Sequence, residues 1–248
     1  MAMSRAIDFS ADAYRRLVRG FLDHGYETRF FDDFNRDDAH LLLRHDIDQC
    51  LQAAARLAEI EAEMGVSSTY FVLLRTEMYN PLSHDGTAAI RGIADLGHRI
   101  GLHFDPSLYP DDRDAYEAAA VRECTILESL LEGPVGVISF HRPAPSLLGL
   151  PGRLAGRLHA YAQAFFSDIA YCSDSTGQWR HGHPFDHADF GENRAMQLLT
   201  HPVWWMSPGN APAEKLRTVL DGRVERLDRE LAENCRPWRE MSKRRGKR

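Results

Sequence analysis

The feature that most constrains the fold is a regular alternation of strand and helix patterns along nearly the whole chain. Short apolar runs rich in β-branched and aromatic residues alternate with longer segments whose apolar residues recur at helical spacing. Strands that alternate with helices are typical of βαβ units, so the sequence predicts a parallel sheet. Strands are predicted at 40–46, 68–74, 99–104, 135–140, 169–172 and 197–199, and helices at 10–24, 49–64, 87–96, 111–131 and 213–233.

Several predicted strands end on polar residues, in the sequences HDID, LHFD, SFHRP, YCSDS and LLTHP. In closed parallel barrels the working site lies at the carboxyl ends of the strands. We therefore expect an α/β fold with a distorted (β/α) barrel as a single domain. An open doubly wound sheet is the alternative fold, but no GxGxxG turn follows the first strand.

Residues 1–36 are assigned to a helix and strand that pack on the barrel, 37–235 to the barrel, and 236–248 to a basic, disordered tail. The polar, His-rich segment 178–193 is interpreted as a loop over the mouth of the site.

Composition excludes some function classes. The net charge of −6 argues against a general nucleic-acid binder. The basic end, residues 243–248, is interpreted as a solvated terminus, with a phosphate or membrane contact as the alternative. The sequence has no run of 18 apolar residues and no signal-peptide pattern at its start, so we expect neither a membrane span nor export. The four cysteines form no CxxC pair, which argues against a zinc knuckle and favours reduced thiols and a cytoplasmic location. Oligomeric state is not predicted.

The first group of chemically interesting residues is Arg44, Asp46 and Asp48, at the end of one strand. Alternation lets all three side chains point to the same face. Two neighbouring carboxylates repel each other unless a cation lies between them. A divalent metal resolves the conflict, because one carboxylate becomes a ligand and the other stays free as a base. The plainer alternative is a helix N-cap at Asp48 and a surface ion pair at Asp46.

The second group lies in the segment GHRIGLHFD. His103 and Asp105 alternate onto one face of the predicted strand, and both residue types are ordinary zinc ligands. His98 lies at the start of the strand and is interpreted as structural. On its own, His103 would more often be a buried, hydrogen-bonded core histidine.

Three further strand ends carry candidate side chains. Arg142 could pair with a carboxylate and keep it ionised, or could instead anchor the loop that follows. Asp174 could orient a histidine and Trp179 could form the floor of a sugar pocket, although Asp-Ser-Thr-Gly is also ordinary turn chemistry. His201 could act as a general acid toward a leaving amine. At least one of Trp204 and Trp205 is expected to pack against the barrel end.

Taken in order, DxD, GHxIGxH, RP, Asp…Trp and LxHP resemble the motifs of the polysaccharide deacetylase-like family (carbohydrate esterase family four). The match runs from about Leu41 to Trp205. The resemblance implies a distorted (β/α) barrel that binds a divalent metal, usually zinc. It implies the following roles: Asp46 as catalytic base, Asp48 and His103 as metal ligands, Arg142 as the residue that steadies the base, Trp179 as an orienting residue and His201 as catalytic acid.

The sequence departs from the family at one metal ligand. The family usually supplies a histidine four residues after the first, where this chain has Ser107. Strand parity favours Asp105 as the substitute, and His141 is the second candidate. The expected function is metal-dependent removal of an N-acetyl group from an amino-sugar substrate, either a glycan precursor or a nucleotide sugar. The alternatives are a catalytically impaired sugar-binding barrel and a hydrolase of another non-peptide C–N bond.

Overall fold

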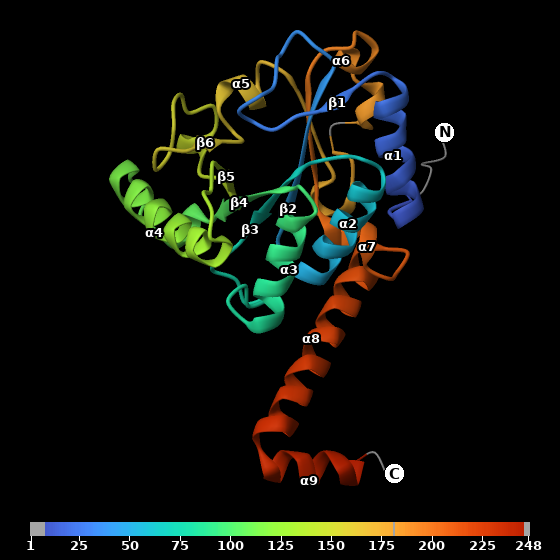
Figure 1. The fold of residues 1–248 in the computed structure, drawn as a ribbon, viewed down its shortest axis with the longest axis vertical. Coiled ribbons are helices and arrows are strands. Elements are labelled where there is room, and N and C mark those ends of the chain that lie inside the picture. Colours follow the sequence, from blue (N-terminus) through green and yellow to red (C-terminus); the bar gives the residue numbers. More distant parts are fainter. Residues whose placement is uncertain (1–7, 181, 246–248) are drawn as a thin grey trace. The chain divides into compact units, whose positions relative to one another are not determined.

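The computed structural model describes residues 8–180 and 182–245 (Figure 1). These residues fall into two compact units, the first ending at Met206 and the second beginning at Ser207. The strands are β1 Glu27–Thr28, β2 His40–Ile47, β3 Thr69–Val72, β4 Arg99–Phe104, β5 Val137–Phe140, β6 Leu158–His159, β7 Ala170–Ser173 and β8 Met196–Thr200. The helices of the first unit are α1 Ala11–Asp23, α2 Leu51–Glu63, α3 His84–Asp95, α4 Arg113–Leu131, α5 Gln163–Phe166, α6 Ala188–Gly191 and α7 Pro202–Met206. The second unit contains α8 Pro212–Asn234 and α9 Arg236–Arg245.

All strand pairs are parallel, as the alternation predicts. The eight-stranded sheet has the order β6-β5-β4-β3-β2-β8-β7, and β1 pairs with the start of β2. Because the strands are parallel, their carboxyl ends meet at one edge of the sheet. The polar residues that follow β2, β4, β5, β7 and β8 are therefore brought to the same end of the first unit.

The sheet is curved strongly enough to bring distant strands together across its concave face. Ser139 on β5 donates a hydrogen bond to Asp46 on β2 at 3.2 Å, although β3 and β4 lie between the two strands. Strands three places apart in a flat sheet would be roughly 14 Å apart. The distorted barrel predicted from the sequence is therefore confirmed, and the open, flat alternative is excluded.

Side chains cover the seam where the barrel does not close. Within the described residues, no backbone pairing joins β6 to β7. Gln197 on β8 reaches across this gap and donates its amide to the carbonyl oxygens of Ala160 and Phe165, at 3.2 and 2.5 Å. Arg44 donates to both Gln197 and Tyr161, each at 3.2 Å. A buried polar network thus replaces the missing ladder of backbone bonds.

The longer helices of the first unit cover the outer face of the curved sheet, and α2 and α3 lie side by side (Figure 1). Helix α2 packs through small residues, because Ala53, Ala54 and Ala58 are all fully buried. Helix α1 begins after Ser10, whose side chain accepts a hydrogen bond from the Ala13 amide as the sequence pattern predicts. Among the described residues, no helix is both long and apolar enough to cross a membrane.

Gly101 on β4 lies where the barrel interior has no room for a side chain. A Cβ atom at this position would lie 2.5 Å from the Phe71 ring and 2.9 Å from the carbonyl oxygen of Val137. Phe71 is fully buried, so its ring has little freedom to move away. The absent side chain at 101 therefore makes space for the ring that fills this layer of the interior.

We expect Gly101→Ala to lower the free energy of unfolding by about 1–3 kcal/mol, the usual cost of overpacking a core. Chemical denaturation measures this change. Gly92→Ala is the matched control, since Gly92 lies inside α3 and a Cβ atom added there would have nothing within 4 Å. Alanine favours the helix by about 1 kcal/mol over glycine, so Gly92→Ala should not destabilise. Equal stability of the two variants would contradict the packing argument.

The carboxyl-terminal residues differ from the predicted disordered tail, because Arg236–Arg245 form helix α9. Arg236 pairs with Glu240 one turn later at 2.7 Å, and the Trp238 indole donates to Asp228 on α8 at 3.0 Å. These contacts favour helix over coil at this end. Residues 246–248 of the predicted tail lie outside the described residues. The predicted limit of the barrel at residue 235 lies within the second unit, since the first ends at Met206.

Candidate metal and catalytic site

Asp46 lies inside the barrel at the end of β2 and is held by two buried donors. Arg44, which is fully buried, donates to Asp46 Oδ2 at 3.2 Å, and the Ser139 hydroxyl lies 3.2 and 3.3 Å from the two carboxylate oxygens. Asp46 is only 2% exposed. A buried carboxylate that accepts hydrogen bonds from a guanidinium and a hydroxyl keeps a fixed orientation.

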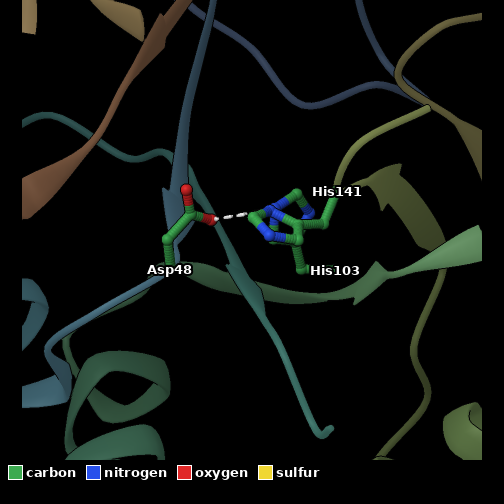
Figure 2. Close-up of side chains that lie close together, drawn as sticks. All are labelled: Asp48, His103 and His141. Carbon is green, nitrogen blue, oxygen red and sulfur yellow. Dashed lines mark hydrogen bonds and ion pairs between the residues drawn. The ribbon is translucent and has the colours of Figure 1, made fainter. Parts of the chain in front are cut away.

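Asp48, His103 and His141 form a compact cluster of metal-ligating types. His103 Nε2 lies 3.0 Å from Asp48 Oδ1, and His141 Nδ1 lies 3.4 Å from the same oxygen. Figure 2 shows both imidazole rings turned toward the Asp48 carboxylate. One ligand atom from each residue lies within 4.8 Å of the others. The cluster combines the ends of three strands, because Asp48 follows β2, His103 is on β4 and His141 follows β5.

The distances in this cluster fit a small divalent cation. Oxygen and nitrogen ligands about 2.0–2.2 Å from a tetrahedral metal lie roughly 3.4 Å from one another. The spacings of 3.0 and 3.4 Å are close to this value. One carboxylate and two imidazoles are also an ordinary donor set for catalytic zinc. Within the part of the chain that the structure describes, this is the group of ionisable side chains that meets the geometry of a metal site.

The charges of the cluster depend on one another. Burial disfavours ionised Asp48, yet hydrogen bonds from His103 and His141 and the nearby His201 hold the pKa of Asp48 well below its usual range. Burial likewise disfavours charged His141, but the hydrogen bond and the charge of Asp48 raise the pKa of that imidazole above its ordinary value. The cluster therefore contains an ionised carboxylate, Asp48, that attracts positive charge. A cation site requires a negative charge of this kind.

His201 and Asp174 form a second pair on the opposite side of Asp48. Asp174 is fully buried and accepts from His201 Nδ1 at 2.6 Å and from the Trp205 indole at 2.7 Å. The other ring nitrogen, Nε2, lies 3.7 Å from Asp48 Oδ2. Burial disfavours the charged imidazole, but the Asp174 carboxylate outweighs it and raises the pKa of His201 to about 9. His201 therefore presents a protonated Nε2 toward the cluster near neutral pH.

The structure does not bring Asp105 into the cluster, although strand parity favoured it as a ligand. Strand β4 ends at Phe104, and Asp105 caps the short turn Pro106–Leu108. Its carboxylate accepts from the amide and hydroxyl of Ser107, at 3.1 and 2.7 Å, and from Arg142. The alternation that holds within a strand stops where the turn begins, so parity no longer predicts where Asp105 points.

Arg142 also lies away from the position that the resemblance implied for it. Its guanidinium pairs with Asp105 and its side chain is 61% exposed, whereas Arg44 occupies the place beside Asp46. The local reason is the backbone, because Arg142 has a left-handed φ of 53° immediately after the strand. His141 continues the alternation from Ser139 and faces inward, and the reversal at Arg142 turns that side chain outward.

Trp179 packs among aromatic side chains next to Trp205. Its ring centroid is 6.1 Å from that of Phe9 and 6.2 Å from that of Trp205. Trp205 makes the hydrogen bond to Asp174 instead. The sequence offered a signal for this residue in the Trp204-Trp205 pair next to His201, but that pair was interpreted only through packing, which was expected for at least one of the two. His98 lies at the other end of β4, bonded to the Ala58 carbonyl, and is structural as predicted.

Comparisons with known proteins find likeness in solved structures alone. No family model matches the sequence, and no curated protein does. The deacetylase PplD of Streptococcus pyogenes, solved in complex with acetate, is 12% identical over 88% of this chain and 90% of its own, with a TM-score of 0.46. A family 4 carbohydrate esterase from Bacillus anthracis is 13% identical over 91% and 93% of the two chains, with a TM-score of 0.46.

A third solved structure is a wild-type pseudoenzyme of carbohydrate esterase family four from Bacillus anthracis. It is 13% identical over 77% of this chain and 63% of its own, with a TM-score of 0.42. Two of these three solved structures, both from Bacillus anthracis, are described as carbohydrate esterase family four proteins.

Proposed function

We propose that this chain is a metal-dependent hydrolase that removes an N-acetyl group from an amino-sugar substrate. The observation that carries the proposal is the arrangement around Asp48. A three-residue ligand cluster lies between a buried carboxylate and a carboxylate-bound imidazole. Asp46 Oδ2 lies 3.8 Å from His103 Nε2, and His201 Nε2 lies 3.7 Å from Asp48 Oδ2. A base, a cation site and an acid in this order suit the hydrolysis of an amide bond.

Asp48, His103 and His141 are the residues that would hold the metal, and their oxygen and nitrogen donors suit zinc. When bound, a divalent ion lowers the pKa of a water molecule and polarises an acyl oxygen. Asp105 has no part in this ligand set, because its carboxylate is already committed to Ser107 and Arg142. The departure from the family pattern at Ser107 is thus compensated by a histidine from the next strand.

Asp46 is the general base in this proposal. Its carboxylate lies beside the cluster without belonging to it, and Arg44 and Ser139 fix its orientation. A carboxylate oriented in this way accepts the proton of the attacking water while its own position does not change. Arg44 therefore performs the steadying role that the family resemblance implied for Arg142.

His201 is the general acid. Asp174 binds Nδ1, which leaves the protonated Nε2 directed toward the space beside Asp48. An imidazole whose pKa is raised to about 9 holds its proton near neutral pH and donates it to the departing amine. The Trp205 indole and the His201 amide fill the remaining acceptor positions of Asp174, so this carboxylate has one fixed orientation.

The choice of His141 as third ligand leads to a direct prediction. His141→Ala should lower zinc affinity by more than the roughly 10–100-fold that loss of an outer partner costs. Asp105→Asn should leave zinc affinity close to that of the unmodified protein, because the amide still accepts from Ser107. Competition with a chromophoric chelator measures both. The assignment is wrong if Asp105→Asn weakens zinc binding and His141→Ala does not.

The reaction itself is tested by acetate release. Protein reconstituted with about one zinc per chain is incubated with a panel of N-acetylated sugars and nucleotide sugars, and free acetate is measured. Release that disappears with a chelator and returns with zinc supports the proposal. Tight metal binding with no release across the panel would instead favour the sugar-binding barrel, and release of ammonia or ring-opened product would favour another C–N hydrolase.

A further inference from the structure

A buried polar network lies on the outer face of the sheet, behind the proposed site. Glu61 of α2 is fully buried and accepts four hydrogen bonds. The donors are Tyr14, His45 Nε2 at 2.9 Å, the Ser68 hydroxyl at 2.7 Å and the Tyr70 hydroxyl at 2.8 Å. Four donors on two oxygens satisfy an ionised carboxylate, and they tie α1, α2, β2 and β3 to one point.

His45 extends this network to β8. Its second ring nitrogen, Nδ1, lies 2.7 Å from the Thr200 hydroxyl. Nε2 is thus used by Glu61, and Nδ1 and the Thr200 hydroxyl make the second hydrogen bond of the ring. Glu61, His45 and Thr200 thus form a continuous chain in which each side chain is completely buried.

The hydrogen bond between His45 and Thr200 joins β2 and β8 at their last paired position, next to the proposed base and acid. His45 and Thr200 are the final register partners of β2 and β8. The next residue on β2 is Asp46 and the next after β8 is His201, and both turn to the inner face. The His45–Thr200 bond therefore fixes the distance between the two strands one residue before the proposed base and acid.

The order carboxylate, imidazole and hydroxyl also occurs in nucleophilic hydrolases, but burial excludes that use here. Thr200, His45 and Glu61 have no exposed surface, so no substrate reaches the hydroxyl. A hydroxyl activated by such a pair must face a site that admits the reacting carbonyl. We call the Glu61–His45–Thr200 chain a clamp, because its His45–Thr200 hydrogen bond holds β2 and β8 at a fixed distance.

A second route connects Glu61 to His201. The Tyr14 ring, which donates to Glu61, packs edge-on against Trp205 with centroids 5.3 Å apart. Trp205 donates to Asp174, and Asp174 binds His201. Both routes end at the proposed acid, one through the backbone of β8 and one through the carboxylate that orients the imidazole.

We propose that the buried chain Glu61–His45–Thr200 positions His201 relative to Asp46 and thereby sets the rate of the proposed reaction without touching the substrate. The role rests on the proposed function. Glu61, His45 and Thr200 are positioning residues in this scheme, since each acts through β2, β8 or Asp174.

Thr200→Val tests the clamp, because it removes the hydroxyl and keeps the branched shape. We expect a roughly 10- to 100-fold lower kcat, the cost of a small misplacement in a site, with KM and zinc affinity unchanged. Thr200→Ser keeps the hydroxyl and should restore kcat. Ser68→Ala is the matched control for stability, since it removes one donor to Glu61 and leaves the His45–Thr200 bond intact.

A readout that needs no substrate separates the clamp from the proposed chemistry. The ring ¹⁵N resonances of His201, recorded at one pH, should move or broaden in Thr200→Val and remain in place in Thr200→Ser and Ser68→Ala. If the His201 resonances move in Thr200→Val but the unmodified protein releases no acetate, the clamp is supported and the proposed deacetylase function is refuted. Resonances and kcat that are the same in Thr200→Val and Ser68→Ala would overturn the clamp, even where acetate release is robust.

Discussion

Asp46→Asn is expected to lower kcat by on the order of 10²–10⁴, the contribution of one proton-transfer group, while zinc content stays the same. The amide has the shape of the carboxylate but cannot accept the proton of the attacking water. The three proposed ligands lie on other residues, so the substitution leaves the cation site complete. Acetate release and elemental analysis on the same preparation measure the two effects together.

Asp48→Asn is the contrasting variant, because it removes a ligand and should abolish zinc binding and turnover together. Asp46→Asn also leaves the buried Arg44 guanidinium without its carboxylate partner, so thermal unfolding must accompany the assay. Asp46→Glu keeps the charge opposite Arg44 and still displaces the base, so it should fold well and remain slow. Full turnover in Asp46→Asn with zinc bound would remove Asp46 from the role of base.

Much of the site could be predicted because strand ends obey simple geometry. The alternation within β2 predicts that Arg44 and Asp46 share a face, and both lie inside the barrel. Parallel pairing predicts that residues after different strands converge, and Asp48, His103 and His201 do so. These inferences needed no loop conformation, only the period of a strand and the direction of the sheet.

The remaining assignments depended on residues beyond the ends of strands, where periodicity carries no information. Asp105 follows the last residue of β4 and becomes the cap of a turn, so its carboxylate leaves the face that His103 occupies. Arg142 reverses direction through a left-handed backbone, which no pattern in His-Arg-Pro announces. An inward-facing Arg142 would have placed its neighbour His141 on the outer face, which is why His141 was only the second candidate for the missing ligand. Ser139, which pairs in register with His103, is the residue that fixes the correct parity.

The Glu61 network was not predicted either, since a single Glu in the Ala- and Glu-rich helix α2 resembles its exposed neighbours. Glu59 and Glu63 lie on the same helix, and the four hydroxyl and imidazole donors to Glu61 come from three separate segments. Only the tertiary fold brings Tyr14, His45, Ser68 and Tyr70 to one carboxylate. The contribution of the Glu61 network to stability therefore depends on the tertiary fold and not on the sequence of α2 alone.

Glu61→Gln is expected to lower the free energy of unfolding at pH 7 by about 3 kcal/mol. Burial alone would raise the pKa of Glu61, but the charge and hydrogen bond of His45, with smaller effects from His98 and Tyr14, lower it from 4.5 to about 2. The difference of about 2.5 pH units, at 1.36 kcal/mol for each, corresponds to about 3 kcal/mol. Denaturant unfolding of both proteins at pH 7 measures it.

The pH dependence of that difference gives the sharper test. The pKa of Glu61 is lower in the folded than in the unfolded chain, so its stabilisation is complete above about pH 5 and is lost as the pH falls toward about 2. The gap between the unmodified protein and Glu61→Gln should therefore narrow by about 1.4 kcal/mol for each pH unit below 4.5. Glu63→Gln alters an exposed pair with Arg15 and should change stability by less than about 0.5 kcal/mol at every pH. A Glu61→Gln gap that stays constant from pH 7 down to pH 3 would mean that the pKa of Glu61 is the same in the folded and the unfolded chain, and the four hydrogen bonds would then not favour the ionised carboxyl.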